Sequence, residues 1–331
     1  MQSSDFPPEG YKKWFRRPTI FAAVTWLLSC AAGQIILARL AGPLSNAFSA
    51  IGIRSSGRAL ALALGAVYRL GLMLLPVYFY AKSHEGVTAS MRLKKPKLIT
   101  LLYAPVIGAV LVPLTRVITI LWSLMLQAAG GTPTYSVRGP NGGLSLIVCL
   151  LLDALIAGVC EELMLRGAVL GAWERRGTER GLVVVTLFSA LLCGSVIELP
   201  ANALLYAMFG LITVMSGSLY VGMLAHVSYS ALMILLDARI GSYEIHDFLR
   251  IIVGEGRLGV YLATLVWSLG LYAALIYLFR SVCVHGGSWS GFHKEKTPEE
   301  MDPAEVLILG VALITVFLLC GENFLSIIKL K

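Results

Sequence analysis

Charged residues are scarce in this sequence: only 14% of the 331 residues are Asp, Glu, Lys or Arg, whereas 57% are hydrophobic. So little charge excludes an ordinary water-soluble domain and is typical of a polytopic membrane protein. The apolar runs are continuous and longer than the alternating segments of about ten residues that build membrane β-barrels. We therefore predict an all-α fold, a polytopic membrane helix bundle. At roughly 20 residues per crossing, the chain has room for about eight or nine transmembrane helices.

Several common site signatures are also missing. The six cysteines have neither paired spacing nor a Cys-x-x-Cys motif, which argues against a disulfide framework and a zinc knuckle. No HExxH, P-loop or GxSxG motif is present. A GxGxxG match at 254–259 precedes an apolar span instead of lying in a βαβ unit, so it predicts a loop and no nucleotide site. The net charge of +8 gathers in inter-helix loops and indicates membrane orientation, not nucleic-acid binding.

The positive loops orient the predicted spans. Lys and Arg are concentrated in the leader 1–18 and in the segments 81–97 and 174–180, which predicts that these three segments are cytosolic. The first apolar stretch is too long for a cleaved signal peptide and predicts a signal anchor with a cytosolic N-terminus. The predicted spans are 19–41, 59–80, 98–127, 144–170, 182–197, 201–215, 218–236, 258–279 and 304–320.

We divide the chain into the cytosolic leader 1–18, N-terminal transmembrane helices at 19–143, a core at 144–236 and C-terminal transmembrane helices at 237–331. The lipid bilayer is the predicted partner of this multi-pass integral membrane protein. Its membrane would be the plasma membrane if the protein is bacterial.

A cluster of charged residues interrupts the fourth predicted span. Glu161, Glu162 and Arg166 lie within an otherwise largely apolar run, although each charge costs roughly 2.5–3.5 kcal/mol near the centre of a membrane helix. Glu162 and Arg166 are four residues apart, so helical geometry predicts an ion pair between them. Glu161 is rotated by about 100° and is expected to be free, with Asp153 on nearly the same side. These side chains are expected to line a wet cavity.

Arg116 and His226 also lie within predicted spans. Arg116 is expected to need an internal partner, and His226 is expected to meet the acids of the fourth span, because intramembrane ionisable groups pair with one another and mark functional sites. The remaining histidines fall in polar loops and are expected to be solvated; they are His84, His246, His285 and His293.

The order of these motifs resembles the CPBP family of intramembrane proteases, which includes the type II CAAX prenyl proteases and bacteriocin-processing or immunity proteins. The resemblance covers about 144–236 and rests on Glu161-Glu162-x-x-x-Arg166, Leu199-Pro200, Gly217-Ser218-Leu219 and His226. It implies two further groups: the histidine of a Phe-x-x-x-His motif, and an Asn or Asp four residues after His226. Here Ile197 or Glu198 stands in the histidine's place, depending on the count, and Ser230 stands in the Asn or Asp place.

The resemblance implies a membrane-embedded endopeptidase that hydrolyses a peptide bond in a membrane-anchored or lipidated substrate. Glu161 would activate the water, His226 would donate to the oxyanion or hold the water, and Arg166 would orient Glu162. Glu198 and Ser230 are the candidate replacements for the missing family groups.

Three alternatives stay open at this point. Zinc bound by Glu161, Glu198 and His226 is disfavoured. Glu198 is expected at the outer end of its helix, whereas Glu161 is expected nearer the inner face of the membrane, so the side chains would not surround one ion. No other cofactor is predicted. The second alternative is a catalytically inactive CPBP-fold scaffold or immunity protein, which the missing family groups favour. The third is an ion-coupled membrane transporter, since intramembrane acids also relay protons.

Overall fold

Helices account for nearly all of the chain that the computed structural model describes, which comprises residues 18–50, 57–83, 91–131, 136–138, 140, 143–244, 258–287 and a few between 303 and 314. Nearly all of the predicted leader 1–18 and most of the predicted ninth span, 304–320, lie outside the described residues, as do His84, His246 and His293.

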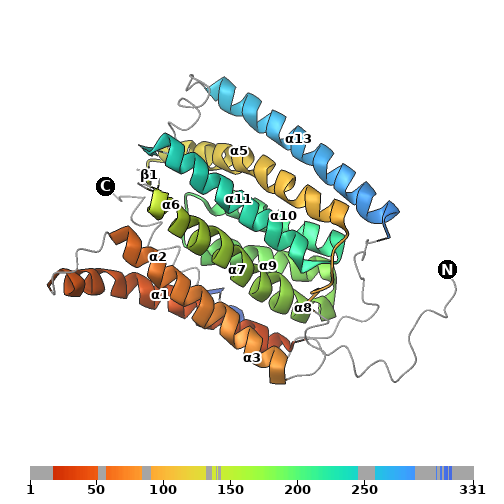
Figure 1. Ribbon diagram of the computed structural model, residues 1–331, viewed down its shortest axis with the longest axis horizontal. Coiled ribbons are helices and arrows are strands. Elements are labelled where there is room, and N and C mark those ends of the chain that lie inside the picture. The colour runs from red at the N-terminus through yellow and green to blue at the C-terminus, as the bar shows by residue number, and fades with distance from the viewer. Residues whose placement is uncertain are drawn as a thin grey trace.

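The helices follow the apolar runs in order (Figure 1). Two of the crossings are built from several segments, because π-helical turns widen the helix locally. The elements are α1 (Ile20–Ala50), α2 (Gly57–Tyr68) continued by η2 (Arg69–Leu74) and α3 (Leu75–Ser83), α5 (Leu98–Ala128), α6 (Gly143–Cys149) continued by η3 (Leu150–Ile156), α7 (Ala157–Glu162), η4 (Leu163–Val169), α8 (Leu170–Trp173) and η5 (Glu174–Arg176), then α9 (Thr178–Leu192), α10 (Leu199–Ser216), α11 (Leu219–Ile240) and α13 (Leu258–His285).

Within the described residues, six helices are long and apolar enough to cross a membrane. They are Ile20–Leu37, Leu60–Ser83, Leu98–Ala128, Leu199–Ser216, Leu219–Ile240 and Leu258–His285. This result confirms the predicted all-α polytopic membrane bundle. Two further predicted spans are helical but differ from these six: residues 143–173 carry the charged cluster, and α9 has only 15 residues. The total of eight or nine crossings therefore stays a prediction.

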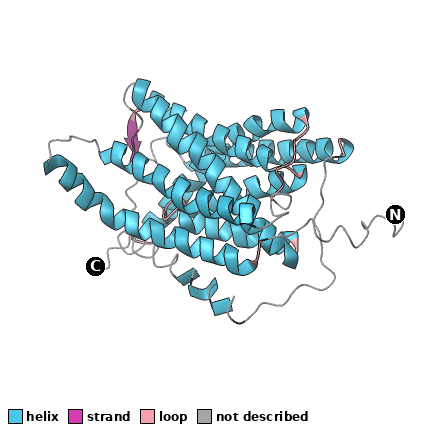
Figure 2. Ribbon diagram, turned by 60° about the horizontal axis from the view of Figure 1, so that its bottom comes forward, coloured by secondary structure: helices cyan, strands magenta, loops and turns pink. Residues whose placement is uncertain are grey.

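Contacts between distant segments join the chain at each of the two ends of the bundle. At one end, the Leu219 N–H donates to the Arg92 carbonyl at 2.9 Å and the Arg92 side chain contacts Glu174, so the two predicted cytosolic loops meet. At the other end, β1 (Ser136–Arg138) pairs antiparallel with β2 (Ser242–Glu244), which joins the segment after α5 to the segment after α11. Figures 1 and 2 show this short ribbon at one end of the helices.

Glycines let α11 pack closely against helices on two sides. A Cβ added at Gly108 of α5 would lie 2.5 Å from the Ala225 carbonyl oxygen, and one added at Gly158 of α7 would lie 2.7 Å from Val227 Cγ2. Such close approach of helices is typical of small residues in membrane bundles. Ala225 and Val227 flank His226, so these contacts fix the position of the intramembrane imidazole.

Arg116 has the internal partner that its place in an apolar helix requires. Its Nη2 donates to both carboxylate oxygens of Asp237, at 3.0 Å and 3.2 Å, and its side chain is 4% exposed. The predicted span 218–236 ended before Asp237, and that boundary was wrong: α11 extends to Ile240. The ion pair explains the extra turn, because Arg116 compensates the charge of Asp237 inside the bundle.

We expect Asp237→Leu to destabilise the protein in detergent by about 3–5 kcal/mol, because it removes the carboxylate that compensates a buried guanidinium. Combining it with Arg116→Met should restore most of the thermal midpoint, since a buried ion pair replaced by apolar side chains is close to neutral. Glu179→Gln, at an exposed glutamate of α9, is the control. A double variant no more stable than the single one would contradict this account.

Candidate active site

Glu162 is the buried centre of the charged cluster. Its side chain has no exposed surface, and its Oε1 lies 3.1 Å from Arg166 Nη1 and 3.0 Å from His226 Nδ1. The predicted ion pair between Glu162 and Arg166 is therefore present. One carboxylate oxygen thus joins the fourth predicted span to α11 and fixes both partners.

Helix α10 packs against both Arg166 and His226. Arg166 Nη2 donates to the Tyr206 carbonyl at 2.8 Å, and its guanidinium lies 4.9 Å from the centre of the Tyr206 ring. The His226 ring stacks on Phe209, with ring centres 4.8 Å apart and an interplanar angle of 21°. Stacking and hydrogen bonding together leave the imidazole little freedom to rotate.

The contact with Glu162 also determines what His226 presents to its surroundings. A carboxylate only accepts hydrogen bonds, so the Nδ1 that faces it carries the proton. In the neutral ring, Nε2 is then an acceptor. This Nε2 lies 3.9 Å from Glu161 Oε2, a separation at which one water can contact both atoms. The expected meeting of the acids with the imidazole is observed, and its catalytic role stays a prediction.

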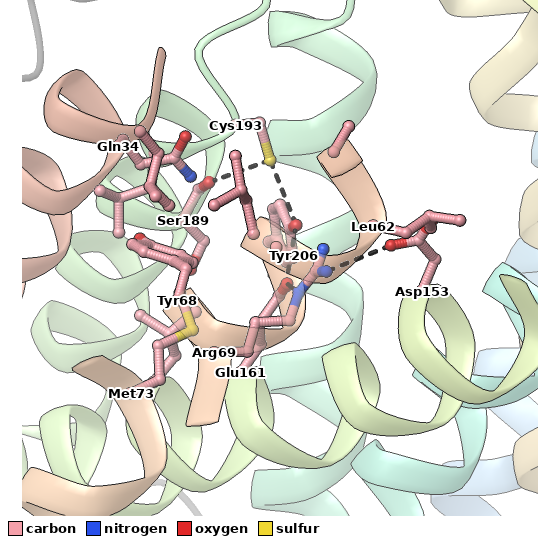
Figure 3. A pocket seen from close by; sticks show the side chains of 16 residues that line it. Gln34, Leu62, Tyr68, Arg69, Met73, Asp153, Glu161, Ser189, Cys193 and Tyr206 are labelled. Carbon is pink, nitrogen blue, oxygen red and sulfur yellow. Dashed lines mark hydrogen bonds and ion pairs between the residues drawn. The ribbon is translucent and has the colours of Figure 1, made fainter. Parts of the chain in front are cut away.

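Glu161 is paired with Arg69, so the expectation that it is free was wrong. Arg69 Nε lies 3.1 Å from Glu161 Oε1, and Arg69 Nη1 lies 3.2 Å from Asp153 Oδ1 (Figure 3). The hydroxyl of Tyr206 donates to Glu161 Oε2 at 3.4 Å. Asp153 and Glu161 do share one side of the helix, as predicted, because both contact the same guanidinium.

A cavity of about 550 Å³ opens beside Glu161. One part of its lining is polar and the rest is apolar, and the labelled side chains in Figure 3 converge on it. Glu162, Arg166 and His226 are absent from this lining. Glu161 is therefore the acid of the pair that faces the cavity, whereas Glu162 supports the site from within the protein. The lining residues are Gln34, Leu37, Ala61, Leu62, Leu64, Gly65, Tyr68, Arg69, Met73, Asp153, Glu161, Leu165, Ser189, Leu192, Cys193 and Tyr206.

Sequence reasoning missed Arg69 and Tyr206. Arg69 carried a usable signal, because it is the one charged residue between positions 59 and 81 of an apolar run, which is the argument that identified Arg116. Tyr206 carried no such signal, since a tyrosine in an apolar helix is unremarkable until its neighbours are known. Its hydroxyl also lies 3.2 Å from Cys193 Sγ, which extends the polar side of the cavity.

Two predicted residues stay apart from this cluster. None of the contacts that join Glu161, Glu162 and His226 includes Glu198 or Ser230. Glu198 immediately precedes α10, and its N–H donates to Ser195 Oγ at 3.3 Å. Ser230 is half-buried one turn beyond His226.

The zinc alternative does not fit the side chains. In the described part of the chain, no three His, Cys, Asp or Glu side chains come together in a way that could hold a metal ion. Glu161, Glu198 and His226 therefore do not come together as the disfavoured zinc alternative would require. The carboxylate of Glu161 faces the Arg69 guanidinium instead.

The fold is that of an integral membrane protein built as a helical bundle. Its interior holds a buried cluster of ionisable side chains, namely an acid, an arginine and a histidine. Residues 143–232 match the family model described as Type II CAAX prenyl endopeptidase Rce1-like. This match confirms the resemblance seen in the sequence: the segment from α6 into α11 is similar to the type II CAAX prenyl endopeptidases of the CPBP family. Comparison with curated proteins and with solved structures gave no match.

We expect Gly222→Ala to destabilise the site. The added Cβ would lie 2.1 Å from Thr213 Oγ1 and 3.3 Å from Glu162 Oε2, and overpacking of this kind costs about 1–3 kcal/mol. Adding Thr213→Ala removes the clashing oxygen and should recover the thermal midpoint. Gly270→Ala is the control, because nothing lies within 4 Å of its added Cβ. Equal effects of Gly222→Ala and Gly270→Ala would show that α10 and α11 are not in close contact here.

Proposed function

We propose that the protein is a membrane-embedded endopeptidase that cuts a membrane-anchored or lipidated peptide with a water activated by Glu161. One observation carries the proposal: Glu161 faces a cavity of about 550 Å³ while its Oε2 lies 3.9 Å from His226 Nε2. A base and a second polar group at one water's distance are the minimum that peptide hydrolysis requires.

The reaction follows from the placement of these groups. A water held by Glu161 Oε2 and His226 Nε2 transfers a proton to Glu161 as its oxygen attacks the substrate carbonyl carbon. The protonated Glu161 then delivers that proton to the leaving nitrogen as the C–N bond breaks. Glu162 and Arg166 do not touch the substrate; they hold the imidazole in its orientation. The apolar part of the cavity suits a substrate delivered from the bilayer.

The charge pattern supports an orientation for this site. Arg92 of the basic segment 81–97 contacts Glu174 of the basic segment 174–180, so these two residues lie at the same end of the bundle. Under the positive-inside rule this end faces the cytosol, and the N-terminus is cytosolic as well. In a bacterium the membrane would be the plasma membrane.

An inactive CPBP-fold scaffold or immunity protein is the second candidate, and the cavity wall favours it. Phe188 and Leu192 of α9 have the spacing of the family's Phe-x-x-x-His motif, and Leu192 lines the cavity. Ile197 packs instead with Leu126 and Val196, away from the cavity. We therefore infer that Leu192 occupies the histidine's place. Leucine can neither bind a proton nor donate a hydrogen bond.

The first test of the proposed function is Glu161→Gln. This variant keeps the size of the side chain but removes the base, so cleavage of membrane-anchored peptides in proteoliposomes should fall by at least about 10²-fold. His226→Ala should reduce cleavage as well, because it removes the second group that holds the water. Fragment release is followed by mass spectrometry across a panel of prenylated, acylated and transmembrane peptides.

Glu179→Gln is the matched control, since this glutamate is exposed. Unchanged cleavage in Glu161→Gln would exclude Glu161 as the base. No cleavage of any peptide by the wild type would favour the scaffold.

The second test is Leu192→His. If the cavity wall lacks only the histidine implied by the family, this substitution should increase kcat, because a new imidazole would face Glu161 across the cavity. Leu62→His places the same side chain elsewhere on the cavity wall and should give no increase. Equal rates in the wild type and both variants would mean that Leu192 is not the position of the missing group.

A further inference from the structure

Arg69 reaches the cavity from a helix outside the segment that matches the family model. Its Nε and Nη1 are bound to Glu161 and Asp153. Its Nη2 has no hydrogen-bond partner among the described residues, and the guanidinium lines the cavity (Figure 3). The side chain is 21% exposed. Unused N–H donors on a permanent cation therefore face the space beside the candidate base.

The local structure holds this guanidinium in place. Arg69 begins the π-helical turn η2, and Gly65 lies one turn earlier on the same helix. A Cβ at Gly65 would lie 3.2 Å from Arg69 Nη1, so the glycine leaves room for the side chain. Asp153 binds one edge of the guanidinium from the neighbouring helix. The group is thus oriented before any substrate enters.

The proposed hydrolysis needs a donor for the oxyanion, and the family positions do not provide one. With Nδ1–H donating to Glu162, the His226 ring in its neutral form presents an acceptor at Nε2. Leu192 has no polar side-chain atom, and Ser230 is absent from the cavity lining. The Tyr206 hydroxyl is directed at Glu161 Oε2. Arg69 is the cation beside Glu161 that has a donor to spare.

We propose that Arg69 is a catalytic residue that donates hydrogen bonds to the tetrahedral oxyanion; this rests on the proposed peptidase function. As the water oxygen bonds to the carbonyl carbon, its proton moves to Glu161 and the carbonyl electron pair moves to the substrate oxygen. The negative charge leaves Glu161 and appears on the oxyanion, so the guanidinium exchanges one anion for the other. When the oxyanion collapses, the C–N bond breaks and Glu161 returns the proton to the amine nitrogen.

The number of charged groups around Arg69 favours the transfer of negative charge from Glu161 to the oxyanion. Three carboxylates (Asp153, Glu161 and Glu162) face two guanidinium groups (Arg69 and Arg166) in this part of the bundle. The net charge of the site stays constant when a proton moves from water to Glu161 and the oxyanion forms. A fixed cation next to both positions stabilises the charge at each stage without reorganising the site.

Kinetics provide the first test. Arg69→Gln should lower kcat by about 10²–10³-fold, the usual cost of losing an oxyanion donor, with little change in KM. Arg69→Lys keeps the charge but loses the planar fork, and should recover part of the rate. Arg39→Gln, at an exposed arginine of α1, is the matched control and should behave as the wild type. A wild-type rate in Arg69→Gln would overturn the proposal and leave the peptidase function standing.

Binding of a transition-state mimic provides a test that does not depend on cleavage. The probe is a membrane-anchored peptide with a phosphinate in place of the scissile amide, compared with the same peptide carrying a neutral ketomethylene group. Arg69→Gln should weaken phosphinate binding by about 10²-fold and leave ketomethylene binding unchanged. No phosphinate binding by the wild type, or equal binding by both proteins, would overturn the role of Arg69. Binding that depends on Arg69 without any cleavage would support the anion site and reject the peptidase.

Discussion

The buried carboxylate of Glu162 is the interaction on which the rest of the site depends. It has no exposed surface and contacts both Arg166 and His226. A charge in this position is tolerated only because a guanidinium compensates it and because α10 supplies further polar and aromatic contacts. Once Glu162 is fixed, the tautomer and direction of the imidazole are fixed as well. The geometry near Glu161 is a consequence of this single pairing.

Glu161 and Glu162 have different roles, because neighbouring residues of a helix point to different sides. Glu162 turns into the bundle and is structural, whereas Glu161 turns to the cavity and meets Arg69, Tyr206 and the edge of His226. The same principle of pairing extends to Arg116 and Asp237. Glu161 with Arg69 and Arg116 with Asp237 are pairs between different helices. Glu162 contacts Arg166 on its own helical stretch and His226 on α11, so these contacts also join the helices of the bundle.

The helices and their local ion pair could be predicted from the sequence, whereas most side-chain contacts between different helices could not. Apolar length and loop charge predicted the helices, and four-residue spacing predicted the pair of Glu162 with Arg166, because both are local properties. The partner of Glu161 was not predictable, since Arg69 comes from a helix 92 residues away in the sequence. Counting from Cys193-Gly194 pointed to Ile197 and counting back from Leu199-Pro200 pointed to Glu198, but α9 ends at Leu192. The turn that follows α9 moves both residues away from the cavity, which only the three-dimensional structure reveals.

The central claim is that Glu161 faces water inside the membrane, and chemical labelling tests it directly. In a cysteine-free background, Glu161→Cys is compared with Leu155→Cys, a position on the same helical stretch whose side chain is 45% exposed on the outside of the bundle. A membrane-impermeant thiol reagent is added to both sides of proteoliposomes, and the labelling rate is measured. We expect rapid labelling at position 161 and little at 155. Labelling at 161 that is no faster than at 155 would contradict the account.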